Sequence, residues 1–372
     1  MGGEKIAQVF IVFTILMIAA TAPALAFNLK PEATDLDGKL RSLGTSWWIK
    51  ITDEATVYVI DHFTNPVHEE ITHRIFGCEG GRDICSSPKK PHNFASDAVI
   101  AGVRWNDNPP FELEAGGKGL AECRGKTIRL PNFSECWVKL FKDAKKRAKQ
   151  GEVFDANSGA VLLYRVHFGD MQFLHAMATR DGEEVGETKR KILMWGELAY
   201  KLAIGEIDRS TELRKCGIPG MESIFGKRGW TAQQLFTRGD PTFRGKQDFR
   251  DFAFGTLLHL IEDSFAGGHV DRDESSGAGC EKATDYLQPG KIRSFHAFNR
   301  QDSKRHGKED SQEALARHLL TTKPNVVDVG KVIKSYYEAK RPWTELKDYL
   351  ECIFDVDDPA IKAGPGEKFL PE

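Results

Sequence analysis

The feature that most constrains this chain is an apolar helical segment that carries ionisable residues. Residues 248–265 place large apolar side chains on most sides of the expected helix: Phe252, Phe254, Leu257, Leu258, Leu260 and Ile261. We therefore expect the segment to be buried. It also contains His259, Glu262 and Asp263. His259 and Asp263 are four residues apart, so they share one helix face.

Burying an imidazole and a carboxylate among leucines is costly unless something compensates them. A divalent metal does so, and histidine with aspartate is a typical nitrogen and oxygen ligand pair for zinc. His269 follows Gly267 and Gly268, where a tight turn can fold it back toward the helix end. The alternative is a hydrogen bond between His259 and Asp263 without a metal. Because buried charges need a partner, we favour the metal.

The remaining pattern predicts a mainly helical chain. Helices are expected over 67–76, 96–103, 136–149, 189–204, 326–340 and 343–354. The Gly- and Pro-containing segment 205–245 is expected to form a long loop or a small excursion. Strand signals are few and no internal repeat is visible. We predict a single compact multi-helix domain over residues 27–372.

The first 26 residues are predicted to be a cleavable signal peptide. Lys5 precedes an apolar run over 6–20, and Ala24-Leu25-Ala26 supplies small residues for cleavage before Phe27. An uncleaved anchor is the alternative, but the run is short and Pro23 follows it closely. No later stretch is apolar enough to cross a bilayer. We expect a secreted or periplasmic protein without a transmembrane segment after signal removal.

Export permits disulfides among the seven cysteines. The short separations suggest that Cys78 pairs with Cys85 and Cys123 with Cys136, and the odd count leaves at least one cysteine over. The formal net charge of −2 gives no general attraction to nucleic acid. No dedicated nucleic-acid partner is expected.

Several other histidines and aspartates occupy unusual local settings. His68 stands where a helix opens, and Asp107 lies in the proline-containing segment 105–109. His167 begins the sequence His-Phe-Gly-Asp. The segment 296–310 adds two more histidines and two aspartates, namely His296, Asp302, His306 and Asp310. Taken singly, each of these residues is more often an ordinary surface or core residue than a metal ligand.

Together they resemble a known family. The order His68, Asp107, His167-Phe168-Gly169-Asp170, and then residues 255–269 with His259, Asp263 and His269, resembles the zinc-dependent phospholipases C and the related fungal single-strand-specific zinc nucleases. The segments 105–109, 167–170 and 173–177 resemble the bacterial phosphatidylcholine-hydrolysing branch. The resemblance covers about residues 66–310, with an insertion at about 205–245.

The resemblance implies an all-α domain that binds two to three zinc ions. By position, one zinc would be held by Asp107, His167, His259 and Asp263. A second would be held by His269 with a downstream histidine–acid pair. His68 would join a third, with Asp263 as a candidate bridge between metals.

The chain departs from the family pattern in two places. The family uses its mature N-terminal residue as a ligand shortly before the first histidine, but Phe27 lies far before His68. Trp47 and Trp48 are nearer and would need a second cleavage.

The other departure is the downstream pair, normally a histidine with an acid four residues later. His296 has Arg300 at that spacing, whereas His306 has Asp310. We slightly favour His296 with Asp302, because it follows the preceding motif more closely, and keep His306 with Asp310 open. His175 is retained as a supporting or alternative ligand.

The implied function is that of a secreted phospholipase C acting at a membrane surface. It would convert phosphatidylcholine-like lipids to diacylglycerol and a phosphorylated headgroup by attack of a zinc-bound hydroxide. Asp107 is the candidate to orient or deprotonate the attacking water. One alternative is a zinc nuclease or general phosphodiesterase, for which base stacking would require aromatic residues beside the zinc. Trp105, Phe168 and Phe173 could serve either substrate. Another is a non-catalytic, zinc-stabilised binding protein with closed tetrahedral sites.

Overall fold

The computed structural model describes residues 66–86, 94–113, 121–130, 133–226, 229–238, 245–273 and 278–372. The expected signal peptide, Phe27, Trp47 and Trp48 lie outside the described residues. Among the helices that are described, none combines the length and apolar character needed to cross a membrane.

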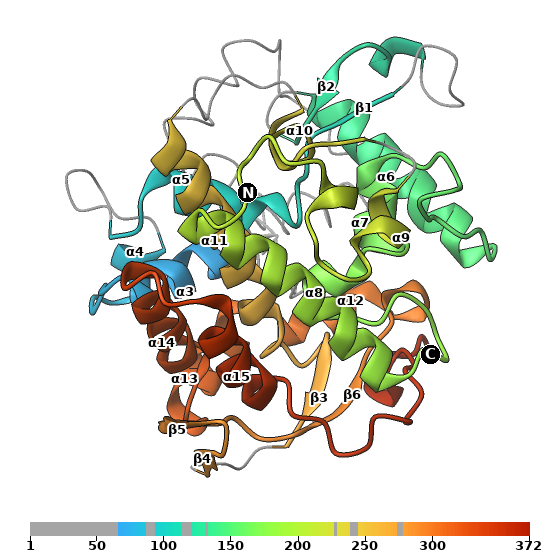
Figure 1. The fold of residues 1–372 in the computed structure, drawn as a ribbon. Helices are drawn as coiled ribbons and strands as arrows, with labels where there is room; N and C mark the ends of the chain where they lie inside the picture. The colour runs from blue at the N-terminus through green and yellow to red at the C-terminus, as the bar shows by residue number, and fades with distance from the viewer. Residues whose placement is uncertain are drawn as a thin grey trace, which may run out of the picture.

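Helices make up most of the described chain (Figure 1), which confirms the expected mainly α character. They are α3 (Val67–Ile75), α4 (Arg82–Cys85), α5 (Asp97–Trp105), α6 (Ser134–Lys149), α7 (Leu162–Phe168), α8 (Val185–Ile204), α9 (Met221–Phe225), α10 (Ala232–Thr237), α11 (Lys246–Asp263), α12 (Ser303–Glu309), α13 (Gln312–Thr321), α14 (Val326–Glu338) and α15 (Trp343–Ile353).

Strands are short and pair into three antiparallel two-stranded sheets, β1 with β2, β3 with β6 and β4 with β5. Their bounds are β1 (Phe111–Glu112), β2 (Thr127–Ile128), β3 (Val270–Arg272), β4 (Gly279–Cys280), β5 (Ala283–Leu287) and β6 (Ile292–Phe295). The pair β3–β6 follows α11 and lies below it in Figure 1.

The predicted helices are all present, with shifted ends, and six further helices occur among the described residues. The segment 205–245 contains α9 and α10, so it is a small helical excursion. Outside that segment, the helices α4, α7, α12 and α13 were not predicted. Almost every side chain of α7 is buried, so it lacks the one-sided apolar pattern on which such a prediction depends. Helix α12 is short and polar, and it follows Asp302, whose carboxylate accepts the backbone N–H groups of Lys304 and Arg305 and so caps the helix.

The packing that positions the later site is the crossing of α5 and α11. A Cβ atom added to Gly102 would lie 2.0 Å from the carbonyl oxygen of Phe252, and one added to Gly255 would lie 2.1 Å from that of Val99. The two helices therefore touch backbone to backbone, which only glycine allows at these positions. The turn after α5 is consequently held close to the side of α11.

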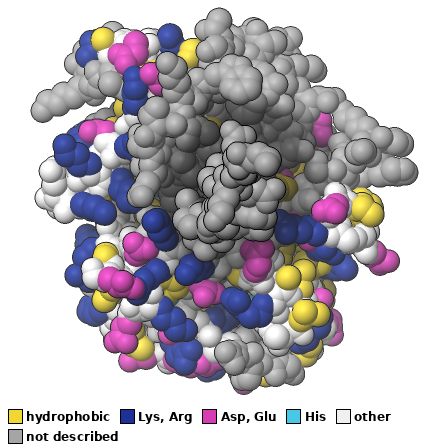
Figure 2. Space-filling model, turned by 180° about the vertical axis from the view of Figure 1, so that it is seen from behind, with side chains coloured by type: hydrophobic (Ala, Val, Ile, Leu, Met, Phe, Trp, Pro, Cys, Tyr) yellow, Lys and Arg dark blue, Asp and Glu magenta, His cyan; other side chains and the backbone are white. Residues whose placement is uncertain are grey.

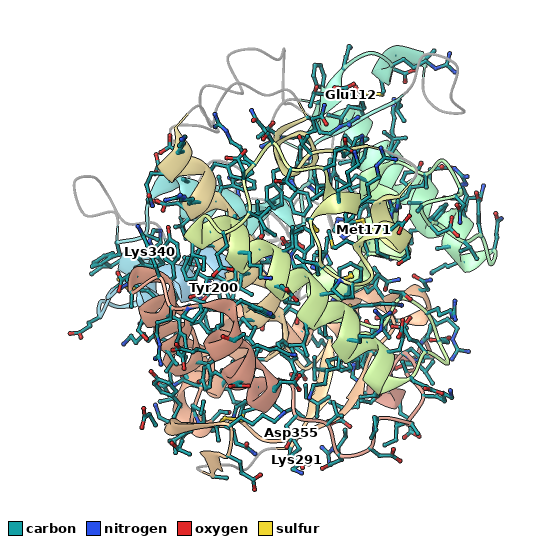
Figure 3. All side chains as sticks on the ribbon, viewed as in Figure 1. Glu112, Met171, Tyr200, Lys291, Lys340 and Asp355 are labelled. Carbon is teal, nitrogen blue, oxygen red and sulfur yellow. A yellow bond between two sulfur atoms is a disulfide. The ribbon has the colours of Figure 1, made fainter. Side chains whose placement is uncertain are left out.

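Helix α8 packs against both α5 and α11. The Trp195 ring of α8 stacks on Trp105 of α5 at 5.8 Å, and Phe236 of α10 meets Trp105 edge-on at 5.1 Å. Tyr200, labelled in Figure 3, donates its hydroxyl to the backbone oxygens of Tyr336 and Arg341. These contacts join α8 to the end of α14.

Three disulfide bonds link pairs of cysteines in the described residues. Cys78–Cys85 and Cys123–Cys136 confirm the predicted local pairs. Cys280–Cys352, which was not predicted, ties the β4–β5 pair to α15. Cys216 is the remaining free thiol.

The surface is of mixed charge. Lys and Arg side chains are interspersed with Asp and Glu over the described part of the face in Figure 2. Lys291 and Asp355 lie side by side in Figure 3, with their charged atoms 3.4 Å apart. This mixture agrees with the small formal net charge of the chain.

Candidate metal centre

Nine ionisable side chains from distant parts of the sequence meet between α3, α11 and α12. Each of them is 6% exposed or less: His68, Asp107, His175, His259, Glu262, Asp263, His269, His306 and Asp310. Helix α11 contributes three, and the others come from α3, the turn after α5, the 3-10 turn Gln172–His175, the turn after α11, and α12 with its C-terminal end. Three subsets bring ligand atoms close enough to hold a metal ion.

The first group consists of Asp107, His175 and His259, and with Asp263 it forms a cage of four atoms that can act as metal ligands. His175 Nδ1 and His259 Nε2 lie 3.1 Å apart, and each is 2.9 Å from Asp263 Oδ2. Asp107 Oδ1 lies 3.6 Å from His175 Nδ1 and 3.9 Å from His259 Nε2. Ligands about 2.0–2.1 Å from a tetrahedral zinc are separated by about 3.3 Å. The separations scatter around that value, so a zinc ion fits the cage.

Hydrogen bonds alone leave this cage poorly satisfied. Two imidazole nitrogens face one carboxylate oxygen and each other, so the protons available cannot serve every contact. Asp107 Oδ2, His175 Nε2 and His259 Nδ1 are also buried without a hydrogen bond. Buried polar atoms are nearly always satisfied, and a central cation would satisfy the four inward-facing atoms together.

The second group consists of His269, His306 and Asp310. Asp310 Oδ2 lies 3.0 Å from His306 Nε2 and 3.4 Å from His269 Nε2, and the two rings stack at 4.9 Å. His269 Nδ1 donates to the backbone oxygen of His175 at 2.7 Å. This bond directs the Nε2 atom of a neutral His269 toward Asp310 as an acceptor, the usual arrangement of a metal-binding histidine.

A glycine makes room for this second group. A Cβ atom added to Gly268 would lie 2.7 Å from His306 Nδ1. The Gly267-Gly268 turn therefore returns the chain to the helix end, as the sequence suggested, and also lets the His306 ring approach the backbone.

The third group consists of His68, His259 and Glu262, and Asp263 lies beside it. His68 Nδ1 lies 2.7 Å from Glu262 Oε2, and His68 Nε2 lies 3.4 Å from Asp263 Oδ1. The His68 and His259 rings stack at 4.1 Å. Asp263 thus presents Oδ1 to His68 and Oδ2 to the four-atom cage, which is the position of a bridging ligand.

The electrostatics of the centre are dominated by burial and by contacts between unlike charges. Burial lowers the pKa of His259, but Asp263 and Asp107 outweigh burial and raise it to about 9. Asp263 and Asp310 likewise outweigh burial at His269 and raise its pKa to about 10. The pKa values of Asp263 and Asp310 lie below their usual range, because neighbouring histidines outweigh the effect of burial. Without a metal, protons balance the carboxylates, and a metal would displace those protons.

The structure brings together five of the sequence-predicted ligands, namely His68, Asp107, His259, Asp263 and His269, but not His167. His167 Nε2 donates to the backbone oxygen of Asp107 at 2.8 Å, and its ring stacks on His175 at 5.4 Å. His175 occupies the place in the cage to which the resemblance assigned His167. Asp170, from the same motif, pairs with Arg165.

The preferred downstream pair, His296 with Asp302, also lies outside the three candidate groups. His296 Nδ1 donates to the backbone oxygen of Gly268 at 3.1 Å, and Asp302 caps α12. Neither belongs to a candidate metal group among the described residues. The open alternative, His306 with Asp310, lies beside His269 instead. Their spacing of four residues on α12 was the sequence signal for this pair.

Sequence reasoning assigned no role to Glu262, although it lies in the same apolar helix as His259. The sequence signal that could have pointed to Glu262 was a carboxylate in a helix expected to be buried.

Comparisons with protein-family models, with curated proteins and with solved structures gave no match.

Proposed function

We propose that this protein is a zinc-dependent phosphodiester hydrolase that acts as a phospholipase C. The observation that carries the proposal is the four-atom cage beside the group of His269, His306 and Asp310. Among the described residues, this second group offers three ligands, which leaves one tetrahedral position open. Open sites are typical of catalytic zinc, whereas closed four-ligand sites are typical of structural zinc. This supports an enzyme over a zinc-stabilised binding protein.

The nitrogen and oxygen donors of both groups suit zinc. Bound zinc would polarise a phosphoryl oxygen and lower the pKa of a nearby water. The chain supplies the proton acceptor. Asp107 directs Oδ1 toward His175 and His259, while its Oδ2 has no hydrogen bond. That second oxygen is available to orient an attacking water and take its proton.

A lipid substrate is favoured over a nucleic acid. The three aromatic residues considered for base stacking, Trp105, Phe168 and Phe173, are 2% exposed or less. They cannot present a ring face to a base, which removes the stacking platform they would have supplied to a nuclease. The similarity of segments 105–109 and 167–170 to the phosphatidylcholine-hydrolysing branch supports the phospholipid.

The test is the release of phosphocholine from phosphatidylcholine vesicles. Asp107→Asn should reduce the rate by at least about 100-fold, since the amide cannot accept the proton. Asp302→Asn is the matched control and should keep the activity, because asparagine caps a helix as well as aspartate does. A chelator should abolish the activity and added zinc should restore it.

Full activity of Asp107→Asn would contradict the proposal. Single-stranded DNA and RNA are offered to the same preparation. Their cleavage without phosphocholine release would transfer the proposal to the nuclease alternative.

A further inference from the structure

We propose that a cleft beside the β3–β6 pair binds a small organic anion, a carboxylate or phosphate group on an apolar body, with Arg272 as its cationic partner. The cleft has a volume of about 520 Å³ and lies between the turn after α11, the labelled pair β3–β6 of Figure 1, α13 and the C-terminal segment 366–369. None of the nine ionisable residues of the candidate metal centre lines it. The inference therefore goes beyond the proposed function and does not depend on a bound metal.

Arg272 brings a positive charge to the cleft without a carboxylate to balance it. Its Nη1 donates to the backbone oxygens of Gly290 and Ile353 at 2.8 Å each, and its Nη2 donates to that of Ser264 at 3.2 Å. Among the described residues, no acidic side chain is paired with it, and burial lowers its pKa to about 9 without an opposing effect from an acid. A charge held away from water is costly unless an opposite charge compensates it.

The acids that line the cleft are already balanced. Three of them lie 2.9–3.4 Å from an arginine, Asp271 and Asp273 from Arg293, and Glu309 from Arg317. The remaining one, Glu367, is exposed and is followed by the exposed Lys368. Arg272 is thus the partly buried charge of this cleft that lacks a counter-charge, and an anionic ligand would supply one.

A second donor lies on the same wall of the cleft. The guanidinium of Arg272 lies over the Phe265 ring, 4.9 Å from its centroid, and the His318 ring meets the same Phe265 at 5.3 Å. His318 Nε2 accepts the backbone N–H of Val326, so the neutral ring carries its proton on Nδ1. That Nδ1–H donates to none of the described residues. An anion against this wall would meet a fixed cation and a neutral donor together.

The size and the walls of the cleft favour an organic anion over a bare inorganic ion. Its volume falls in the range of small-molecule pockets, about 300–1,000 Å³. Phe265, Val270 and Phe369 give it apolar surface, which an inorganic phosphate would leave uncovered. The alternative is that Arg272 only fastens β3 to the three backbone oxygens it contacts. In that case the cleft has no preference for an anion.

Three probes of similar size separate these possibilities. Benzoate carries a carboxylate, phenylphosphonate carries a phosphate-like group that cannot be hydrolysed, and benzamide is the neutral counterpart of benzoate. Their binding to the full chain, equilibrated with zinc, is measured by isothermal titration calorimetry. We expect at least one of the two anions to bind at least about 10-fold more tightly than benzamide, because a hydrogen bond to a charged group is stronger than a neutral one. The tighter anion identifies the chemical class of the ligand.

A variant that fills the cleft shows where the anion binds. Thr322 lines the cleft, and Thr322→Trp would occupy it without removing a contact of Arg272. We expect this variant to bind the anion at least about 10-fold more weakly. The matched control is Thr321→Trp, at an exposed neighbouring position outside the cleft, which should bind the anion as the wild type does. Arg272→Gln should lower the affinity for the anion to that for benzamide. If this last variant does not fold, the two threonine variants carry the test.

Three results would overturn the inference: no binding of either anion, equal binding of benzoate, phenylphosphonate and benzamide, or equal binding of the anion to the wild type and Thr322→Trp. The last result would place the anion elsewhere, for example at the metal centre. Each of these outcomes leaves the proposed function standing. Conversely, a failure to release phosphocholine would contradict the proposed function and leave this inference untouched.

Discussion

At the scale of single residues, one uncharged amide ties together three segments that carry ligands. Asn106 is fully buried, and its Nδ2 donates to the backbone oxygens of Leu174 at 2.9 Å and Thr256 at 3.3 Å. Leu174 precedes His175, Thr256 lies almost one turn before His259, and Asn106 itself precedes Asp107. The positions of three cage ligands therefore depend on this side chain.

Asn106→Ala should lower the free energy of unfolding by about 1–3 kcal/mol, because two buried carbonyl oxygens each lose a hydrogen-bond donor. It should also weaken zinc binding at the cage. Urea unfolding with and without zinc measures both effects. The exposed Asn157 provides the control, and Asn157→Ala should change stability by less than about 0.5 kcal/mol. Equal behaviour of the two variants would contradict the role given to Asn106.

At the scale of elements, the centre depends on how closely α5 and α11 approach. Their contact through Gly102 and Gly255 sets the distance between Asp107, after α5, and His259, on α11. A side chain at either glycine would have to push backbone away from backbone, and a close-packed interior resists such a shift. The geometry of the cage is thus linked to a helix crossing one to two turns away along α11.

Gly255→Ala should destabilise the protein by several kcal/mol and reduce its zinc affinity, since the added carbon would lie 2.1 Å from a backbone oxygen. The matched control is Gly196→Ala on α8, where the nearest atom would be 3.5 Å away. That change should be neutral or stabilise by up to about 1 kcal/mol, because alanine favours a helix over glycine. Thermal unfolding and zinc titration of both variants test the expectation. A tolerated Gly255→Ala would show that the crossing can relax.

At the scale of the whole molecule, the stability at low pH depends on two buried histidines outside the metal centre. Burial lowers the pKa values of His73 and His318 to about 4. Each accepts a backbone N–H, from Ala95 and Val326 respectively, which requires a neutral ring nitrogen. Arg272 also lowers the pKa of His318, Asp328 raises it and Lys323 lowers it. The folded protein therefore holds both rings neutral at pH values where the unfolded chain protonates them.

The unfolded chain binds these protons near pH 6.5, and the native protein binds them only near pH 4. Stability should consequently fall as the pH decreases from about 6.5 toward 4, and should be unaffected by these two groups above that window. His318→Gln keeps an acceptor that does not titrate, so its stability should depend less steeply on pH. Urea unfolding between pH 4 and 7 with a chelator present measures this without a contribution from metal loss. Parallel pH profiles for the two proteins would exclude His318 as a source of acid sensitivity.

The sequence alone determined the features that depend on neighbouring residues. The apolar periodicity predicted most of the long helices, because a helix face is built from residues three and four apart. The short separations predicted Cys78–Cys85 and Cys123–Cys136. The charged residues of α11 indicated a buried site that needs a cation. Burying a charged side chain in an apolar helix is costly unless an oppositely charged partner compensates it.

Only the tertiary structure decided the membership of that site. It placed His175 in the cage rather than His167, and His306 with Asp310 beside His269 rather than His296 with Asp302. The residues of the centre come from segments far apart in the chain, so their distances follow from helix crossings and turns that spacing does not encode. Glu262 shows the same division. Its burial could be expected from the apolar helix, but its contact with His68 exists only because α3 packs against α11.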